Sequence, residues 1–317
     1  MPCMDGLLVI DKPVDMTSHD VVSSVRRILK ERRIGHTGTL DPFATGVLLV
    51  LVGRATRLAQ FLSGADKEYE AIIRLGYATD TGDRTGTPLP GPNTSDSSQD
   101  KSRFGKWSDN EIQQALASLR GFIDQVPPMY SAKKVGGKKL YEMARRGEVI
   151  EREPVRICIH ELEAIRPDGQ LVKDNLDGTF DFHVRVVCSA GTYVRALAED
   201  FGKRLSVGAH LAELRRTRVG DFSVTNAVSL EQLKTSFGEE ALGTILLRPS
   251  AALSRLPFVH LSGDDVRRTR HGMEVTVGES AWADGEKVKM CDDNGHLIAI
   301  GDYDATTRRL HPSLVLA

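Results

Sequence analysis

RIGHTGTLDPFATGVLLVLVGRATR, residues 33–57, joins a loop rich in glycine and threonine to an unbroken apolar run. The first half, Gly35 to Pro42, has the composition of a shaped loop rather than of a helix or strand. The second half, Val47 to Val52, predicts a buried strand. Asp41 therefore lies in a loop that leads directly into the core.

Strand and helix patterns surround this stretch. Residues 6–10 predict a strand that ends at Asp11-Lys12-Pro13, and partial alternation with β-branched residues predicts strands at 69–75 and 182–188. Apolar residues at helical spacing predict a helix after Ser18, a second over 109–120 and a third after Thr192. Ser18 and Thr192 are the predicted N-caps of the first and third helices. Together these elements predict an α+β fold.

Length and composition limit the classes of protein. With 317 residues and a net charge of −1, the chain is long enough for two domains and shows no overall basic character. The first domain is expected to end near Pro249, and short strands are expected beyond it. Cys3, Cys158, Cys188 and Cys291 form no C-x-x-C pair, which argues against a zinc site and a disulfide framework. The N-terminus is not a signal peptide, and no apolar run could span a membrane.

Positive charge is local rather than general. Basic residues gather at 26–33, at 133–146 and at 215–218, whereas many acids lie between these clusters. RNA binding requires such local clusters and not a basic average. A solvated helix face remains the simpler interpretation for the first cluster. Residues 86–98 are polar and rich in Gly, Pro, Ser and Thr, so a surface loop is expected there.

Asp41 and Arg195 are the main candidates for chemistry. An acid beside proline is often only a turn former, and a functional Asp41 needs a charged partner and a pocket. Arg195 lies at the start of a predicted helix, where the dipole disfavours a cation, so either a carboxylate compensates it or it points into solvent. A pair of the two would lower the pKa of Asp41, whereas burial would raise it.

Three further candidates have both structural and functional interpretations. Tyr69 and Tyr193 lie close to strand ends, where a tyrosine is either an amphipathic core-edge residue or a platform on which a base stacks. His36, close to Asp41, is either a local hydrogen-bonding residue or part of a site.

The 33–57 stretch resembles the catalytic motif of the TruB-type pseudouridine synthases. Other segments resemble that family's motifs in the same order: GLLVIDKPVDMTS, DKEYEAIIRLGYATDTGD, PPMYSAKKVGGKKLYEMARRG, CSAGTYVRALAEDFG and GAHLAELRRTRVG. One departure is Asp15, which stands where glycine is usual in the first motif. Because Asp adopts left-handed geometry more readily than most residues, we expect that loop to survive. The tail segment LPFVHLSGDDVRRTRHGMEV is similar to a PUA domain, a small β-barrel that binds RNA.

The resemblance implies a fold and a domain organisation. Residues 1–248 are expected to form a catalytic domain with a mixed, largely antiparallel sheet. A thumb-like insertion is expected at about 77–130, followed by the basic segment 133–146. Residues 249–317 are expected to form a PUA-like β-barrel.

The resemblance also carries roles onto individual residues. Asp41 aligns with the nucleophilic aspartate, and Arg195 aligns with the arginine that pairs with it. Substrate-binding roles fall on His36, which helps to receive the flipped nucleotide, Tyr69, which stacks on the base, Tyr193 and Leu214, an apolar wall of the uracil pocket. The expected contacts to the RNA backbone come from Lys133, Lys134, Lys138, Lys139, Arg145 and Arg146.

The activity implied by the resemblance is the isomerisation of uridine 55 in the T-loop of tRNA. The family needs no cofactor and no metal, and the expected partner is the tRNA T-stem-loop without a guide RNA. A cytoplasmic monomer is expected. Two alternatives remain open: a guide-dependent ribosomal RNA pseudouridine synthase, and an RNA-binding protein or tRNA chaperone.

Overall fold

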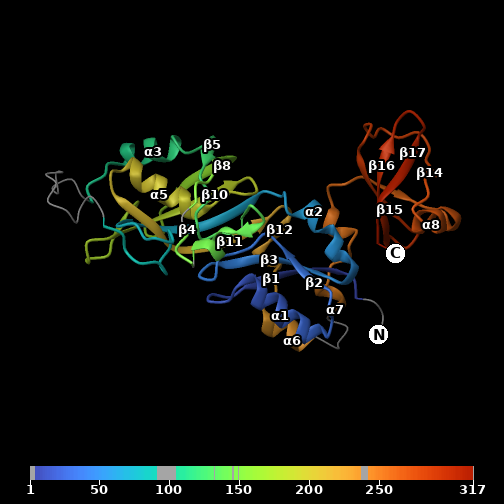
Figure 1. The fold of residues 1–317 in the computed structure, drawn as a ribbon, viewed down its shortest axis with the longest axis horizontal. Helices are drawn as coiled ribbons and strands as arrows, with labels where there is room; N and C mark the ends of the chain where they lie inside the picture. The colour runs from blue at the N-terminus through green and yellow to red at the C-terminus, as the bar shows by residue number, and fades with distance from the viewer. Residues whose placement is uncertain are drawn as a thin grey trace.

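The computed structural model describes residues 4–90, 105–131, 133–144, 146–148, 150–236 and 242–316. A large mixed sheet forms the body of the molecule, and a smaller sheet forms its C-terminal end (Figure 1). The predicted α+β class is confirmed. Among the helices in these residues, we find none that is long and apolar enough to cross a bilayer.

The body sheet contains the strands β1 (Gly6–Lys12), β2 (Ile34–Thr37), β3 (Thr45–Val52), β4 (Lys67–Gly76), β5 (Gly121–Gln125), β8 (Val155–Ile165), β9 (Lys173–Asp174), β10 (Phe180–Cys188), β11 (Gly208–Val219) and β12 (Phe222–Ser223). Its main path is β1-β3-β11-β4-β10-β8-β5. Every pairing on this path is antiparallel except that of β3 with β11, which is parallel. The predicted strands at 6–10, 47–52, 69–75 and 182–188 are thus confirmed.

The described residues form the helices α1 (Ser18–Leu29), α2 (Ala59–Leu62), α3 (Asp109–Ala117), α4 (Leu140–Ala144), α5 (Val194–Arg204), α6 (Leu230–Ser236), α7 (Leu242–Ile245) and α8 (Gly263–Arg270). Short 3₁₀ helices occur at Gly53–Leu58, Val224–Asn226 and Ala251–Leu253. α1 and α6 cover the β1–β3 part of the sheet, whereas α3 and α5 cover β4, β10 and β11 (Figure 1).

β3 is apolar along its length because both of its faces are buried. Its odd-numbered residues from 47 to 51 pack in one cluster with Leu58 and Leu62. Its even-numbered residues from 48 to 52 pack in another cluster with Val21 and Val25 of α1. Alternate side chains of a strand point to opposite faces, so a strand covered on both sides needs an unbroken apolar run.

Both predicted N-caps are wrong by one residue. Thr17, not Ser18, caps α1, since its Oγ1 accepts a hydrogen bond from the Asp20 amide at 3.0 Å. The Ser18 hydroxyl instead bonds to the backbone of Leu40. Tyr193, not Thr192, is the N-cap of α5, and it makes no side-chain cap.

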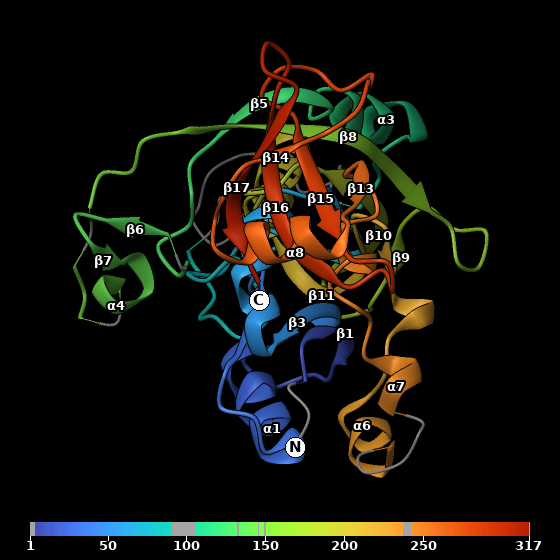
Figure 2. The same cartoon turned by 90° about the vertical axis from the view of Figure 1, so that its right-hand side faces the viewer.

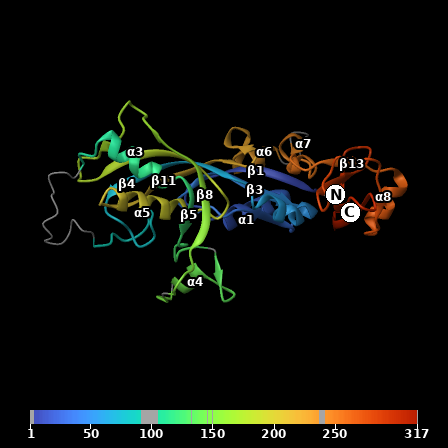
Figure 3. The ribbon, with the colours of Figure 1, turned by 90° about the horizontal axis from the view of Figure 1, so that it is seen from above.

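Part of the expected thumb-like insertion belongs to the body of the molecule. Ile112 and Leu116 of α3 are buried in the core, and β5 pairs with β8, so this half of the segment belongs to the body. Residues 91–104 lie outside the described part of the chain. The unit that stands away from the body follows the insertion: it comprises the hairpin of β6 (Lys134–Val135) and β7 (Lys138–Lys139) and the helix α4 (Figures 2 and 3).

The C-terminal sheet is curled and PUA-like, as expected. It consists of β13 (Phe258–His260), β14 (Val275–Thr276), β15 (Lys287–Cys291), β16 (Leu297–Asp304) and β17 (Arg309–Val315). Their order is β13-β15-β16-β17-β14. Leu253, Ile300 and Leu314 share an apolar cluster with residues of β1, β3 and α2, so this sheet packs against the body.

Candidate active site

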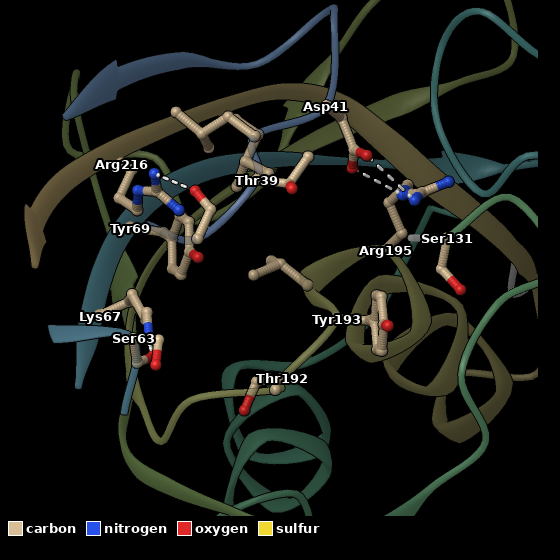
Figure 4. Close-up of a pocket in the computed structure, with 15 residues that line it drawn as sticks. Thr39, Asp41, Ser63, Lys67, Tyr69, Ser131, Thr192, Tyr193, Arg195 and Arg216 are labelled. Carbon is tan, nitrogen blue, oxygen red and sulfur yellow. Dashed lines mark hydrogen bonds and ion pairs between the residues drawn. The ribbon is translucent and has the colours of Figure 1, made fainter. Parts of the chain in front are cut away.

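A cavity with a volume of about 270 Å³ opens between the loop after β2, the start of α5 and strands β4 and β11 (Figure 4). It brings together five of the residues singled out from the sequence: Asp41, Tyr69, Tyr193, Arg195 and Leu214. The rest of its wall is formed by Gly38, Thr39, Leu40, Ser63, Lys67, Ser131, Gly191, Thr192, Val194 and Arg216. Segments more than 150 residues apart in sequence therefore meet at one site.

Asp41 and Arg195 form the ion pair that was predicted. Arg195 Nε lies 2.9 Å from Asp41 Oδ2, and Arg195 Nη2 donates to Asp41 Oδ1 at 3.1 Å. This fork geometry fixes the plane of the carboxylate. The Arg195 side chain is only 5% exposed, whereas that of Asp41 is 32% exposed. The arginine is therefore part of the protein interior, and the carboxylate faces the cavity.

Backbone carbonyls hold the other donors of Arg195. Its Nη1 donates to Thr81 O at 2.8 Å and its Nη2 to Tyr130 O at 2.7 Å. Asp83 adds a second carboxylate, 3.7 Å from Nη1, and is itself buried. The dipole of α5 disfavours a cation at the start of the helix, and these contacts offset that effect.

Side chains of the N-terminal segment fix the loop that carries Asp41. The ammonium of Lys12 is fully buried and donates to Pro13 O, Met16 O and Pro42 O. Asp15 has a φ of 62° and its amide donates to Pro42 O at 2.9 Å. The left-handed geometry expected at Asp15 is thus confirmed. Because Pro42 follows Asp41 directly, both contacts restrain the position of the catalytic candidate.

The pKa of the Asp41 carboxyl is raised above its ordinary value. Burial is the main cause, and the charge of Asp83 acts in the same direction. Arg195 lowers the pKa of Asp41 but does not fully compensate. The lowering expected from the ion pair is therefore outweighed, and Arg195 limits the rise.

Tyr69, Leu214 and Arg216 form the wall opposite this pair. Tyr69 lies on β4 directly across from Arg216 on β11, and Leu214 precedes Arg216 by two residues. Side chains at directly opposed positions of neighbouring strands share one face of the sheet. Tyr69 and Leu214 are almost fully buried, so the wall offers an aromatic and an aliphatic surface to whatever enters the cavity.

Comparison with known proteins supplies the family. A model described as TruB family pseudouridylate synthase, N-terminal domain, matches residues 26–194. A model described as tRNA pseudouridylate synthase B C-terminal domain matches residues 195–253. This chain belongs to the TruB family.

Full-length relatives agree with this assignment. A protein from Symbiobacterium thermophilum named tRNA pseudouridine synthase B is 46% identical over 276 residues, which cover 86% of this chain and 84% of that protein. One of the same name from Solibacter usitatus is 38% identical over 314 residues, 99% of this chain and 100% of that protein. A solved chain from a Cbf5-Nop10-Gar1 complex covers 98% of this chain and 85% of that chain, with 26% identity and a TM-score of 0.71. As a TruB-family member, the chain is a pseudouridine synthase, which is an isomerase.

Tyr193 and His36 differ in their relation to this TruB-family cavity. Tyr193 lines it, held by Gln125, whose amide group both accepts from Tyr193 N at 2.7 Å and donates to Tyr193 O at 3.1 Å. His36 lies on β2 outside the cavity wall, and burial lowers the pKa of its imidazole. Its role with the flipped nucleotide stays a prediction.

The basic segment is only partly described. Lys138 and Arg146 are exposed, and Lys133 is half-buried. Arg145 and the side chains of Lys134 and Lys139 lie outside what the structure describes. The backbone register places Lys134 opposite Lys139 in the hairpin.

The basic cluster predicted at 215–218 is not a free cationic surface. Arg216 is 1% exposed and lines the cavity. Arg215 pairs with Asp11 at 2.7 Å and Arg218 pairs with Glu68 at 3.0 Å. Arg215 and Arg216 point to opposite faces of the strand. The register of β11 against β4 shifts between Arg216 and Arg218, so Arg218 lies opposite Glu68 instead of sharing the cavity face of Arg216.

Two further features of the site were missed in the sequence. Lys67 lines the cavity, and burial lowers the pKa of its ammonium to about 8. Ser131 also lines it, and its buried hydroxyl has no hydrogen-bond partner in the described part of the chain. Both residues lie next to sequence motifs that were recognised, but only the folded geometry shows that they face the cavity. We find no group of three His, Cys, Asp or Glu side chains suited to a metal within the described ranges.

Proposed function

We propose that this chain converts uridine 55 in the T-loop of tRNA to pseudouridine, with the Asp41 carboxylate as the reacting group. The observation that carries the proposal is the forked ion pair of Asp41 with Arg195 inside a cavity lined by Tyr69 and Leu214. Relatives named tRNA pseudouridine synthase B support tRNA as the substrate.

The target nucleotide must leave the folded T-loop to reach this cavity. An enzyme that acts on a base has to flip it out of its stack. Tyr69 provides a buried aromatic face for the flipped ring, and such stacking is worth about 1–3 kcal/mol per base. Leu214 adds an aliphatic surface to the same wall, and Tyr193 lines the cavity from the start of α5.

The proposed reaction breaks the bond from uracil N1 to ribose C1′ and forms a bond from C5 to C1′. The ionised Asp41 either attacks C1′ or removes a ribose proton, and on both routes the electron pair of the broken bond goes to uracil. After the ring turns, C5 bonds to C1′ while Asp41 leaves C1′ on the first route or returns the ribose proton on the second. C5 then loses its proton and N1 gains one. Substrate and product have the same atoms, so the balance requires no oxidant or reductant.

One assay tests this function and separates it from its alternatives. The purified chain alone is incubated with unmodified tRNA, and pseudouridine is mapped at each position. We expect pseudouridine at position 55 without any added RNA, from a monomer. A guide-dependent enzyme would leave the tRNA unmodified, and a pure RNA-binding protein or chaperone would bind tRNA without forming pseudouridine.

We propose that the basic segment 133–146, which includes the β6–β7 hairpin and α4, contacts the RNA backbone. Replacing Lys133, Lys134, Lys138 and Lys139 by Gln should weaken binding to different tRNAs alike, because phosphate contacts carry no sequence information. Each lost contact should also flatten the log–log dependence of affinity on salt by about one. The measurement is tRNA affinity over a salt series for the wild type and the quadruple variant.

A matched control uses lysines elsewhere on the surface. Lys173, Lys203 and Lys234 are exposed and lie outside the predicted RNA-binding clusters. Replacing these three by Gln changes the net charge in the same direction but should leave the salt slope as in the wild type. Equal slopes for the quadruple variant and this control would show that the 133–146 segment is a solvated face.

The C-terminal sheet is proposed to bind a part of tRNA outside the T-arm. A chain that ends at Leu256 should keep its single-turnover rate on an isolated T-arm but bind whole tRNA more weakly. The cut is placed there because Ala252 and Leu253 pack in the cluster of Leu58 and Leu62, which a cut at 248 would uncover further. Since Ile300 and Leu314 of the same cluster are lost in any case, thermal unfolding shows whether the shorter chain remains folded. Equal affinity of the truncated and full chains for whole tRNA would show that this sheet does not touch RNA.

A further inference from the structure

Arg216 is a buried cation without a carboxylate partner. Its side chain is among the largest that are fully buried, and its strand neighbours Arg215 and Arg218 form ion pairs whereas it forms none in the described part of the chain. Its Nε donates to Val47 O at 2.7 Å and its Nη2 to Gly38 O at 2.9 Å. Carbonyl oxygens satisfy donors but do not neutralise the charge, which is costly to keep away from water.

The Arg216 guanidinium lies next to the place that a base stacked on Tyr69 would occupy. Arg216 faces Tyr69 across the β11–β4 pairing, and both line the cavity. Figure 4 shows Arg216 beside Tyr69 at one side of the cavity and Arg195 beside Asp41 at the other. A ring stacked on Tyr69 would therefore be next to Arg216, whereas its ribose would point towards Asp41.

The charge of the cavity is unbalanced on the Tyr69 side. Among the lining residues, Arg195 and Asp41 neutralise each other, which leaves Lys67 and Arg216 without a lining carboxylate. The charge of Arg216 acts with burial to lower the pKa of Lys67 to about 8. Arg216 also lowers the pKa of Tyr69, against the larger effect of burial, which raises it. Both effects indicate a positive potential at the place that the base would occupy.

Cleavage of the N1–C1′ bond creates the matching anion. Whether Asp41 attacks C1′ or removes a proton from the ribose, uracil leaves with the electron pair and spreads negative charge over N1, O2 and O4. We propose that Arg216 stabilises this uracil anion between breakage of the N1–C1′ bond and formation of the C5–C1′ bond. The inference rests on the proposed function and holds for both routes. A fixed cation aimed at developing charge in a water-poor site requires no reorganisation during the reaction.

Substitution of Arg216 separates its charge from its shape. Arg216→Gln keeps a planar, hydrogen-bonding group but removes the charge, and should lower the single-turnover rate about 100- to 1,000-fold, the effect of removing one such donor. Affinity for tRNA should stay close to wild type because the residue does not reach the surface. Arg216→Lys keeps the charge and should retain more activity than Arg216→Gln.

A control for the loss of a carbonyl-bound arginine is available in Arg120, which is exposed rather than buried. Its Nε and Nη2 also donate to a backbone carbonyl, that of Leu162, at 3.0 and 2.7 Å, and it lies outside the cavity. Arg120→Gln removes the same charge and the same type of contact, and should leave turnover unchanged. Thermal unfolding of all three variants shows whether each remains folded.

The decisive test changes the leaving group and compares the single-turnover rates on the two substrates. In 6-azauridine, a ring nitrogen replaces C6, stabilises the ring anion and leaves C5–H in place. If Arg216 stabilises that anion, the loss caused by Arg216→Gln should be severalfold smaller on tRNA carrying 6-azauridine at the target position than on ordinary tRNA. Should Arg216→Gln not fold, Arg216→Met, which also removes the charge, undergoes the same two-substrate comparison.

Each other outcome has a definite meaning. An equal loss on both substrates would overturn the proposal. Arg216 would then have only a structural role, as a residue that links the backbone of Gly38 to that of Val47. Wild-type rates in Arg216→Gln would overturn it as well. If the wild-type chain forms no pseudouridine in tRNA, the proposed function fails first, so the two failures are distinguishable.

Discussion

Asp41→Asn is expected to lower turnover of tRNA by at least about 10,000-fold, the scale seen when a reacting carboxylate or nucleophile is removed. Asn has nearly the same shape as Asp but is neutral at every pH, so it neither attacks C1′ nor accepts a ribose proton. Affinity for tRNA should change little, because the carboxylate occupies only one corner of the cavity. Pseudouridine formation and tRNA binding are measured on the same preparation.

The fold of this variant is controlled separately. Arg195 would lose its charge partner but keep its bonds to Thr81 O and Tyr130 O, and Asp83 stays 3.7 Å away. The Asp41 side chain is 32% exposed to the cavity, so we expect a modest loss of unfolding free energy. Substantial turnover by a folded Asp41→Asn enzyme would remove Asp41 from the catalytic role.

The pairing of Asp41 with Arg195 could be predicted only in part. Composition and spacing allowed Asp41 to be only a turn former and Arg195 to be only a surface residue. The resemblance to the TruB family favoured the pair. No local pattern links residues 154 positions apart, because their contact depends on the way β3, β4 and β11 assemble. The sign of the net pKa shift of Asp41 was also open, since it depends on the degree of burial.

The buried position of Arg216 was missed in the sequence. Consecutive arginines at 215 and 216 suggest a basic surface, but on a strand they point to opposite faces. Predicting β11 as a strand would have exposed this alternation, with Leu214 and Arg216 on one face and Arg215 on the other. The missing partner of Arg216 could not be predicted in any case, because it depends on which carboxylates the fold brings near.

Ser18 shows a similar limit at short range. Ser and Thr are both good N-caps, so the sequence could not choose between neighbours by residue type. Thr17 completes a capping box with Asp20, which frees the Ser18 hydroxyl to bond to the backbone of Leu40. Since Leu40 precedes Asp41, an apparent cap residue in fact supports the active-site loop.

Arg195→Lys is expected to lower kcat by about 100- to 1,000-fold while the chain remains folded. Lysine keeps the positive charge but loses the planar fork, so it cannot hold both oxygens of Asp41 and also reach Thr81 O and Tyr130 O. The carboxylate would then lose its fixed orientation towards the ribose.

The pH dependence of this variant provides a second readout. Burial raises the pKa of Asp41 and Arg195 opposes that rise, so a less closely placed ammonium should leave the pKa higher than in the wild type. Asp41 reacts in its ionised form and is protonated as the pH falls through its pKa. The acid limb of the single-turnover rate should therefore move to higher pH in Arg195→Lys, and part of the loss should be recovered as the pH rises. Wild-type turnover across the pH range would show that the fork geometry is dispensable, and an unshifted acid limb would show that Arg195 does not control the ionisation of Asp41.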